Sequence, residues 1–334
     1  MRAVIIDKPG RLRVAAASDP EAGPGEVVVQ VGCCGICGTD LHILDGEFPP
    51  TPYPIIPGHE FAGTVVSAGP GVSDLAEGTR VAVDPSLFCG RCGYCRAGRG
   101  NLCTDWGAIG DTVNGAFAQY VAVPAGNAYR LPADLGMREA ALIEPLSCAV
   151  HGADQLGNVR GQRALVVGSG TMGLLLAQLL RHGGAAEVAV ADRSRARLAI
   201  ADELGIGPTG TDAGQLPGPG FDVAIDATGA PAAIEAAFAA LRRGGTLMVF
   251  GVADAAARVS LSPFRIYNDE IRVIGSMAVL HSFQAAVDLL ATSAINVGPL
   301  LADAYPLDDF PAAIEAVRTG TTTGTKVQVM PDAA

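Results

Sequence analysis

The segment Ala164–Gly173, which reads ALVVGSGTMG, constrains the fold more than any other part of the chain. Its first four residues are apolar and predict a buried strand, and the apolar run 174–180 that follows is long enough for a helix. In a dinucleotide-binding turn, Gly168 would permit the tight bend, Gly170 would let the backbone approach a pyrophosphate, and Gly173 would let helix and strand pack closely. The helix N-terminus would then present N–H groups to the phosphates.

The context of this glycine pattern decides its meaning, because GxGxxG alone is a weak signal. A second predicted strand, 187–191, ends at Asp192. An acid at this place accepts the ribose 2′-hydroxyl of NAD and repels the 2′-phosphate of NADP. Arg193 and Arg197 offer a 2′-phosphate some charge, but we expect the carboxylate to outweigh them. We therefore predict NAD over NADP; the alternative is a glycine-rich turn in an ordinary α/β unit.

Two patterns of secondary structure divide the chain. Short β-rich runs with glycine and proline breaks (3–6, 26–31, 63–68, 80–83 and 119–123) predict a compact, barrel-like first domain. A helix is expected from near Arg138 towards Leu156, with a kink or restart at Pro145. Beyond Gly161, strands (164–167, 187–191, 222–226, 246–250, 271–274) alternate with helices (172–182, 195–204, 232–241). This alternation predicts a parallel sheet with right-handed crossovers.

The last part of the chain predicts helices at 282–290 and 310–319 and a closing strand at 326–330 that returns to the first domain. Residues 205–220 are predicted to form a surface loop. Thr228, Gly251 and Val252 follow predicted strands, and ligands bind at the carboxyl ends of strands in doubly wound sheets.

The composition and net charge of the chain disfavour some classes of binding partner. A chain of 334 residues with 49% hydrophobic and 17% charged residues predicts a globular protein with room for two domains. The net charge of −11 disfavours nucleic acid and anionic membranes as main partners. Charge precedes any long apolar run at the start, and Arg181 ends the best later one. We therefore expect no signal peptide, no membrane span and a cytoplasmic location.

Four of the eight cysteines lie close together in the sequence. Cys89, Cys92, Cys95 and Cys103 have the spacing C-x2-C-x2-C-x7-C. Four thiolates so close can surround zinc tetrahedrally and leave no site for a substrate. We therefore predict a structural zinc; the alternatives are an iron–sulfur cluster, a redox switch or unrelated core cysteines.

A second constellation is scattered along the chain. It comprises the segments GICGTDLH (35–42) and GHE (58–60), and Glu144 within IEP (143–145). Spacing alone does not single out a metal site here, because each residue also has an ordinary structural explanation.

The motifs taken together resemble the zinc-dependent medium-chain dehydrogenases of the alcohol dehydrogenase superfamily. GICGTDLH, PGHEFAG (57–63), the four-cysteine segment, ALIEPL (141–146) and GxGxxG occur in the family's order over essentially the whole chain. Glu144 stands where alcohol dehydrogenases carry a third cysteine ligand, so the chain is more similar to the sorbitol, polyol and threonine dehydrogenases. The resemblance implies an α/β fold: a discontinuous GroES-like catalytic domain (1–150 and 278–334) and a doubly wound Rossmann domain (151–277).

The resemblance also implies residue roles. Cys37 and His59 would ligate a catalytic zinc, Glu60 would be a ligand or a close carboxylate, and Glu144 would hold the metal directly or through a water. Thr39 would contact the substrate oxygen, and His42 would relay its proton to solvent. We expect two zinc ions per chain, one catalytic and one structural. The predicted cofactor contacts are Gly168, Gly170, Thr171, Met172, Gly173, Asp192, Arg193, Arg197, Thr228, Gly251, Val252 and Lys326.

The implied reaction transfers a hydride between NAD(H) and a secondary alcohol or ketone, with a polyol, sugar or cyclitol as substrate. Sorbitol dehydrogenases carry an Arg-Tyr pair where this chain has Ala278 and Val279, which argues against sorbitol itself. The alternatives are a threonine dehydrogenase-like or aminocyclitol activity, a zinc-free quinone or enoyl reductase, and a non-catalytic NAD-binding structural protein. A homodimer or homotetramer is a family expectation.

Overall fold

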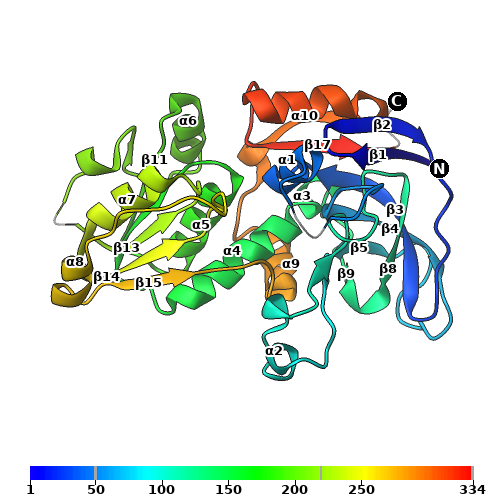
Figure 1. The fold of residues 1–334 in the computed structure, drawn as a ribbon, viewed down its shortest axis with the longest axis horizontal. Coiled ribbons are helices and arrows are strands. Elements are labelled where there is room, and N and C mark those ends of the chain that lie inside the picture. The colour runs from blue at the N-terminus through cyan, green and yellow to red at the C-terminus, as the bar shows by residue number, and fades with distance from the viewer. Residues whose placement is uncertain (49–50, 219, 332–334) are drawn as a thin grey trace. The chain divides into compact units, whose positions relative to one another are not determined.

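The computed structural model describes residues 1–48, 51–218 and 220–331, which pack as two compact units (Figure 1). The first unit comprises Met1–Ser147, Val279–Ser293 and the residues from Leu301 onward; the second comprises Cys148–Ala278 and Ala294–Leu300. The sequence-based division placed residues 294–300 with the first domain. They pack in the second unit because Asn296 exchanges two hydrogen bonds with Gln178, of 2.8 and 3.0 Å.

The second unit is built on a six-stranded sheet in which every neighbouring pair is parallel. Its strands are β10 (Arg163–Val167), β11 (Glu187–Ala191), β12 (Thr209–Gly210), β13 (Phe221–Asp226), β14 (Leu241–Val249) and β15 (Arg272–Gly275). Their spatial order is β12-β11-β10-β13-β14-β15. This is the 3-2-1-4-5-6 order of doubly wound dinucleotide-binding folds, in which ligands bind where the order reverses, here between β10 and β13. The predicted parallel sheet is thus confirmed.

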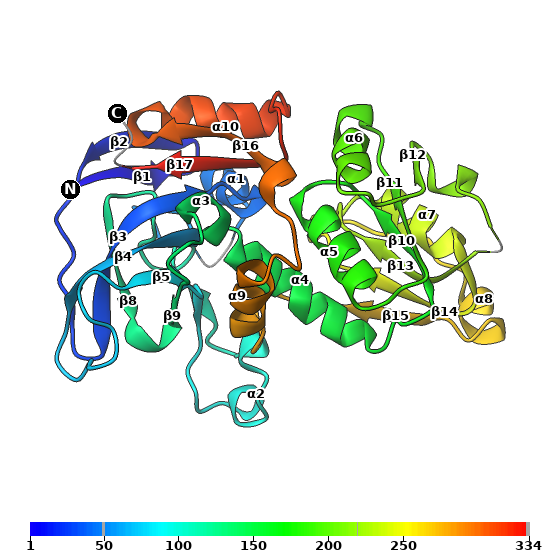
Figure 2. The same cartoon turned by 180° about the vertical axis from the view of Figure 1, so that it is seen from behind.

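Helices cover both faces of this sheet (Figures 1 and 2). They are α5 (Thr171–His182), α6 (Arg195–Glu203), α7 (Pro231–Ala239) and α8 (Pro263–Asn268). Successive side chains of a strand point to opposite faces. Leu165 and Val167 accordingly share a core cluster with Ile234 of α7, whereas Val166 faces Gly173 of α5. Strand β12 and a short 3-10 helix (Ala213–Gln215) lie within the predicted loop 205–220, so that prediction was incomplete there.

Gly173 leaves no room for a side chain, and this gives a testable contrast with Gly170. A Cβ atom at Gly173 would overlap the carbonyl oxygen of Gly168, whereas one at Gly170 would meet no heavy atom within 4 Å. We expect Gly173→Ala to lower the melting temperature of the cofactor-free protein by several degrees, since overpacking costs about 1–3 kcal/mol. Gly170→Ala should leave that melting temperature unchanged. Equal melting temperatures for the two variants, measured by scanning calorimetry, would contradict this account.

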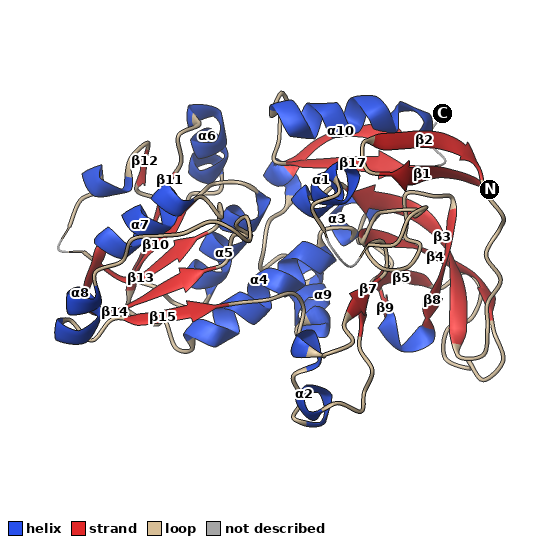
Figure 3. Cartoon of the chain, in the orientation of Figure 1, coloured by secondary structure: helices blue, strands red, loops and turns tan. Residues whose placement is uncertain are grey.

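The first unit is built on a seven-stranded, mainly antiparallel sheet (Figure 3). Its strands are β3 (Glu26–Gly35), β4 (Glu60–Ala68), β5 (Arg80–Val83), β8 (Tyr120–Pro124), β9 (Ala128–Arg130), β16 (Leu301–Pro306) and β17 (Lys326–Met330). Two smaller sheets pair β1 (Arg2–Lys8) with β2 (Arg11–Ala16), and β6 (Ser86–Leu87) with β7 (Gly107–Ala108). Strand β17 lies between β16 and β3 in the large sheet and runs antiparallel to β3. Residues 326–330 therefore pack beside residues 26–35.

Helices of the first unit include α1 (Gly38–Asp45), α2 (Gly93–Arg96), α3 (Met137–Ala140), α9 (Phe283–Ala291) and α10 (Phe310–Thr319). The helix predicted from near Arg138, with a kink or restart at Pro145, is α3 followed by α4 (Ile143–Leu156), so the restart comes two residues before the proline. Pro145 lies in the first turn of α4, where a backbone N–H has no partner within the helix, so the proline costs no hydrogen bond there. Within the part of the chain that the structure describes, no helix is long and apolar enough to cross a membrane.

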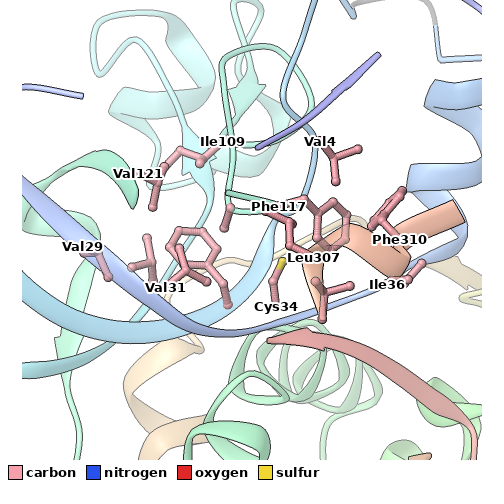
Figure 4. Close-up of a cluster of buried hydrophobic side chains, with 14 of the residues drawn as sticks. Val4, Val29, Val31, Cys34, Ile36, Ile109, Phe117, Val121, Leu307 and Phe310 are labelled. Atoms are coloured by element: carbon pink, nitrogen blue, oxygen red, sulfur yellow. The ribbon is translucent and has the colours of Figure 1, made fainter. Parts of the chain in front are cut away.

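Apolar side chains of β3 and β17, the 109–121 segment and α10 form the core of the first unit (Figure 4). The rings of Phe117 and Phe310 pack with centroids 4.7 Å apart, beside Cys34 and Ile36. Cys34 is fully buried, as is Cys33. This packing holds the end of β3 and the start of β4, where the candidate metal ligands lie.

Candidate active site

Adjacent strands of the first unit bring three predicted ligands together. Gly35, the last residue of β3, pairs with Glu60, the first residue of β4. Cys37 therefore lies just beyond the end of β3, next to His59 and Glu60 at the start of β4. The ligand atoms of Cys37, His59 and Glu60 all lie within 4.8 Å of one another. A Cβ atom at Gly35 would overlap the Glu60 carboxylate, so the glycine makes room for this side chain.

Helix α1 holds Cys37 in place. Cys37 is its N-terminal cap, and its backbone N–H donates a 2.8 Å hydrogen bond to Oδ2 of Asp40. Asp40 is completely buried, and burial is the main reason why its pKa rises to about 7. The carboxylate of Asp40 thus orients the loop that carries the thiol, a role that the sequence did not predict.

His59 lies between two buried acids. Its Nδ1 is 3.2 Å from Oδ1 of Asp111 and 3.7 Å from Oδ1 of Asp40. Burial alone would lower the pKa of His59, but the charges of Asp111 and Asp40 outweigh it and hold this pKa well above its ordinary value. Asp111 was not among the predicted site residues, because nothing in its local sequence relates it to His59.

Lys326 occupies the other side of the cluster. Its buried ammonium donates to both carboxylate oxygens of Glu60, at 2.6 and 2.9 Å, and to the carbonyl of Ile36 at 3.2 Å. Burial alone would lower the pKa of Lys326, but the charges of Glu60 and Cys37 raise it above its ordinary value. We predicted Lys326 as a cofactor contact, and this stays a prediction; in the structure its ammonium pairs with Glu60 in the first unit.

Glu144 lies in the first turn of α4 and is buried. Its charge also raises the pKa of Lys326, so the carboxylate is near the cluster. The ligand atoms of this site that lie within 4.8 Å of one another nevertheless belong to Cys37, His59 and Glu60.

These residues fit a zinc ion by their chemistry. A thiolate, an imidazole and a carboxylate are the ligand types that zinc uses in proteins. Histidine ligands of metals usually donate their second ring N–H to a carboxylate, and Asp111 faces Nδ1 of His59 in this way. The three-residue cluster is therefore a candidate catalytic metal centre.

Thr39 and His42, the residues of the predicted proton relay, both lie on α1, the helix that Cys37 caps. Oγ1 of Thr39 is 3.7 Å from the Cys37 sulfur. His42 is exposed, and its Nδ1 lies 2.7 Å from a carboxylate oxygen of Glu47, a partner that the sequence did not reveal. Helix α1 thus carries a half-buried hydroxyl beside the cluster and an imidazole at the surface.

The four remaining predicted ligands form a second cluster. The sulfur atoms of Cys89, Cys92, Cys95 and Cys103 all lie within 4.8 Å of one another. Backbone N–H groups donate to these sulfurs, from Cys92 to Cys89 at 3.4 Å and from Asp105 to Cys103 at 3.3 Å. Backbone hydrogen bonds from Cys95 and Thr104 lower the pKa of Cys92 to about 6. Four cysteine sulfurs this close together fit a closed, tetrahedral zinc site.

In the second unit, the glycine loop joins β10 to α5. Gly170 is the N-terminal cap of α5, and no side chain caps that helix end in the described structure. Its N-terminus and the open space at Gly170 fit a dinucleotide pyrophosphate. Asp192 braces the loop, because its carboxylate accepts hydrogen bonds from the backbone N–H of Ser169 at 2.7 Å and of Ser194 at 2.8 Å.

The remaining predicted cofactor residues are placed as follows: Thr171, Met172 and Gly173 lie in the first turn of α5, Arg193 and Arg197 are exposed near the start of α6, Thr228 follows β13, and Gly251 and Val252 follow β14.

Asp226, which the sequence did not single out, connects these loops. Its buried carboxylate accepts hydrogen bonds from the backbone and hydroxyl of Thr228 and from the N–H of Gly229. Its backbone carbonyl accepts from Phe250 and Gly251. The sequence did carry a signal for this residue, because Asp226 ends a predicted strand and directly precedes Ala-Thr-Gly. Asp226 therefore fixes the loops after β13 and β14 in one arrangement.

Known proteins with similar sequences cover nearly the whole chain. Residues 23–133 match the family model described as alcohol dehydrogenase GroES-like domain, and residues 171–292 match that described as zinc-binding dehydrogenase. D-arabinitol dehydrogenase 1 of Uromyces fabae is 36% identical over 327 residues, which cover 94% of this chain and 93% of that protein. D-altritol 5-dehydrogenase of Agrobacterium fabrum is 35% identical over 315 residues, covering 92% and 94%.

A solved structure extends this similarity to three dimensions. A zinc-binding dehydrogenase of Sinorhizobium meliloti, bound to NADP, has a TM-score of 0.93 with this chain at 37% identity, and the match covers 99% of both chains.

Proposed function

The chain belongs to the zinc-dependent medium-chain dehydrogenases of the alcohol dehydrogenase superfamily, and from this we propose that it oxidises a secondary hydroxyl of a polyol, sugar or cyclitol with NAD. The observation that carries the proposal is the cluster of Cys37, His59 and Glu60, in which His59 and Glu60 are buried and Cys37 is partly buried. The substrate class is supported by the arabinitol and altritol dehydrogenases among its relatives.

We propose that Cys37, His59 and Glu60 hold the catalytic zinc and that Glu144 approaches it directly or through a water. When bound, zinc supplies Lewis acidity that lowers the pKa of a substrate hydroxyl. Glu60 is held by the ammonium of Lys326, at 2.6 and 2.9 Å, so the carboxylate has a partner whether or not it ligates the metal. That pairing limits the cost of a buried carboxylate in either arrangement.

The proton that leaves the substrate requires a path to solvent. We propose that the Thr39 hydroxyl, beside Cys37, takes up this proton while it releases its own proton towards His42, and that His42, which is exposed, releases a proton to water. Glu47 orients the His42 ring through the 2.7 Å contact at Nδ1. Imidazole suits this role because it exchanges protons near neutral pH.

In the second unit, we propose that the glycine loop and the N-terminus of α5 hold the cofactor pyrophosphate, and that Asp192 selects NAD. The nicotinamide, when bound, supplies the hydride acceptor. Thr228 and Gly251 are held by Asp226 at the carboxyl ends of β13 and β14, where ligands of doubly wound sheets bind.

Asp192→Ala should reduce the preference for NAD by about 10–100-fold, since a hydrogen bond to a charged group contributes about 1.5–3 kcal/mol. The measurement is the ratio of kcat/KM with NAD to that with NADP. Loosening of the loop at Ser169 affects both cofactors and cancels in this ratio. Asp202→Ala on α6 is the control, because Asp202 bonds only to Thr209 among the described side chains. An unchanged ratio in Asp192→Ala would refute selection by this carboxylate.

The decisive test of function is a substrate panel. Polyols, inositols and amino alcohols, including L-threonine, are supplied with NAD and then NADP, and the absorbance of the reduced cofactor is followed; aminocyclitol ketones are tested in reverse. We expect turnover with polyols or cyclitols. Turnover with L-threonine alone would support the threonine dehydrogenase alternative, and no turnover with any compound would support a non-catalytic, NAD-binding protein.

We also propose a homo-oligomer, a dimer or tetramer. Strand β15 is an edge strand of its sheet, and Val273 on it is 45% exposed. Phe264 and Tyr267 of α8 are 68% and 83% exposed. Unpaired sheet edges beside exposed apolar side chains are typical of interfaces. Light scattering coupled to gel filtration measures the mass directly.

A further inference from the structure

His59 has one ring hydrogen to offer at Nδ1 and two buried carboxylates that face it. Both acids, Asp40 and Asp111, are at most 5% exposed. Nδ1 of His59, Oδ1 of Asp40 and Oδ1 of Asp111 are buried without a well-aligned hydrogen bond to any described residue. A neutral imidazole carries one N–H, so it can satisfy only one of the two acids.

The distances favour Asp111 over Asp40 as the acceptor of the Nδ1 hydrogen of His59. Its Oδ1 lies 3.2 Å from Nδ1 of His59, which is the upper limit of an N–H···O hydrogen bond, whereas Oδ1 of Asp40 lies 3.7 Å away and beyond that limit. Asp40 already has another function, because its second oxygen accepts the backbone N–H of Cys37 at 2.8 Å.

The backbone around Asp111 is fixed against the segment that precedes His59. The N–H of Gly115 donates to Ile56, and the N–H of Ala116 donates to Gly58, at 2.7 and 2.9 Å. A Cβ atom at Gly110 would overlap the carbonyl group of Gly58, so the two segments are in close contact on this side too. Asp111 and His59 are therefore held together by backbone packing, independently of any bound ion.

We propose that Asp111 is a positioning residue for the metal: it accepts the Nδ1 hydrogen of His59, fixes that tautomer and leaves Nε2 for the ion. Asp40, in contrast, acts on the cluster through the cap of α1 at Cys37. This inference rests on the proposed function, because it requires that His59 is a zinc ligand. Removing a carboxylate that orients a histidine ligand typically weakens metal binding by about 10–100-fold.

The first test measures the release of zinc from the purified holoprotein to a coloured chelator. The release phase that is missing in Cys37→Ser identifies the catalytic site and separates it from the four-cysteine site. We expect this phase to be about 10–100-fold faster in Asp111→Ala. In Asp111→Asn, which keeps an acceptor oxygen, the release phase should be only partly accelerated. In Asp40→Ala, the release phase should also be accelerated less than in Asp111→Ala. Asp84→Asn is the matched control, because Asp84 is a largely buried carboxyl of the same unit that accepts the N–H of Ser86 instead.

The second test needs no unstable variant. Long-range ¹H–¹⁵N correlation spectra of the zinc-loaded wild-type protein report which nitrogen of each histidine carries the hydrogen, and the chain has only five histidines. We expect His59 to carry it at Nδ1, with the proton signal shifted in Asp111→Asn.

Two results would overturn the inference alone: a hydrogen at Nε2 of His59, or unchanged catalytic-site release in Asp111→Ala together with strong acceleration in Asp40→Ala. If the wild-type protein has no release phase that Cys37→Ser removes, the proposed zinc function fails and the inference fails with it.

Discussion

Cys37→Ser is expected to reduce kcat/KM for alcohol oxidation by about 10³-fold or more while leaving the fold intact. Metal catalysis of this kind contributes several kcal/mol of transition-state stabilisation, and each 1.36 kcal/mol corresponds to tenfold in rate. The substitution removes the only thiolate of the three-residue cluster and leaves His59 and Glu60.

Serine preserves the local structure around position 37. It is a favourable N-terminal cap, so α1 should persist, and the backbone N–H still donates to Asp40. Metal analysis should show the loss of one zinc per chain, and circular dichroism should be unchanged. Cys148→Ser is the control, because it makes the same chemical change at a partly buried cysteine outside both clusters. Wild-type turnover in Cys37→Ser would disprove the proposed mechanism.

Cys92→Ser is expected to unfold the four-cysteine segment and to remove the other zinc. Zinc binding contributes about 10–16 kcal/mol in isolated zinc-finger peptides, as much as the whole stability of many domains. Residues 89–103 contain only two short helical turns and few buried residues, so the segment has little core of its own. Without the metal, we therefore expect this segment to open before the rest of the first unit.

Limited proteolysis followed by mass spectrometry measures this opening. Cleavage should occur first within residues 89–103 in Cys92→Ser, and the melting temperature should fall. Cys37→Ser is the reciprocal control, since it should lose a zinc with little change in cleavage. A Cys92→Ser protein that keeps both zinc ions and resists protease would show that the four sulfurs do not form a structural zinc site.

Local patterns accounted for much of the fold and for the four-cysteine cluster, whereas the catalytic cluster was predicted from the family resemblance. The β10–α5 turn could be predicted because one short segment carries the strand, the glycines and the helix. The four cysteines could be predicted as a cluster because their spacing alone brings them together. Strand β12 was missed because it is two residues long and carries almost no pattern of its own.

The surroundings of the catalytic cluster could not be predicted in this way. Lys326 and Glu60 are separated by 266 residues, yet their side chains form the buried ion pair. Asp111 lies on a different loop from His59, and its local sequence resembles an ordinary turn. The Lys326–Glu60 pair depends on the register of β3, β4 and β17. The approach of Asp111 to His59 depends on backbone hydrogen bonds from residues 115–116 to residues 56 and 58. No single segment encodes either relation.

By itself, the sequence determined the residue types that can bind zinc and a dinucleotide, because a ligand's chemistry and short spacings belong to the local chain. Only the tertiary structure decided which charges face those ligands. It placed the Glu60 carboxylate against an ammonium, His59 between two acids, and Asp192 against the glycine loop. The physical reason is that electrostatic interactions in a buried site depend on distance in space, and strand pairing sets that distance.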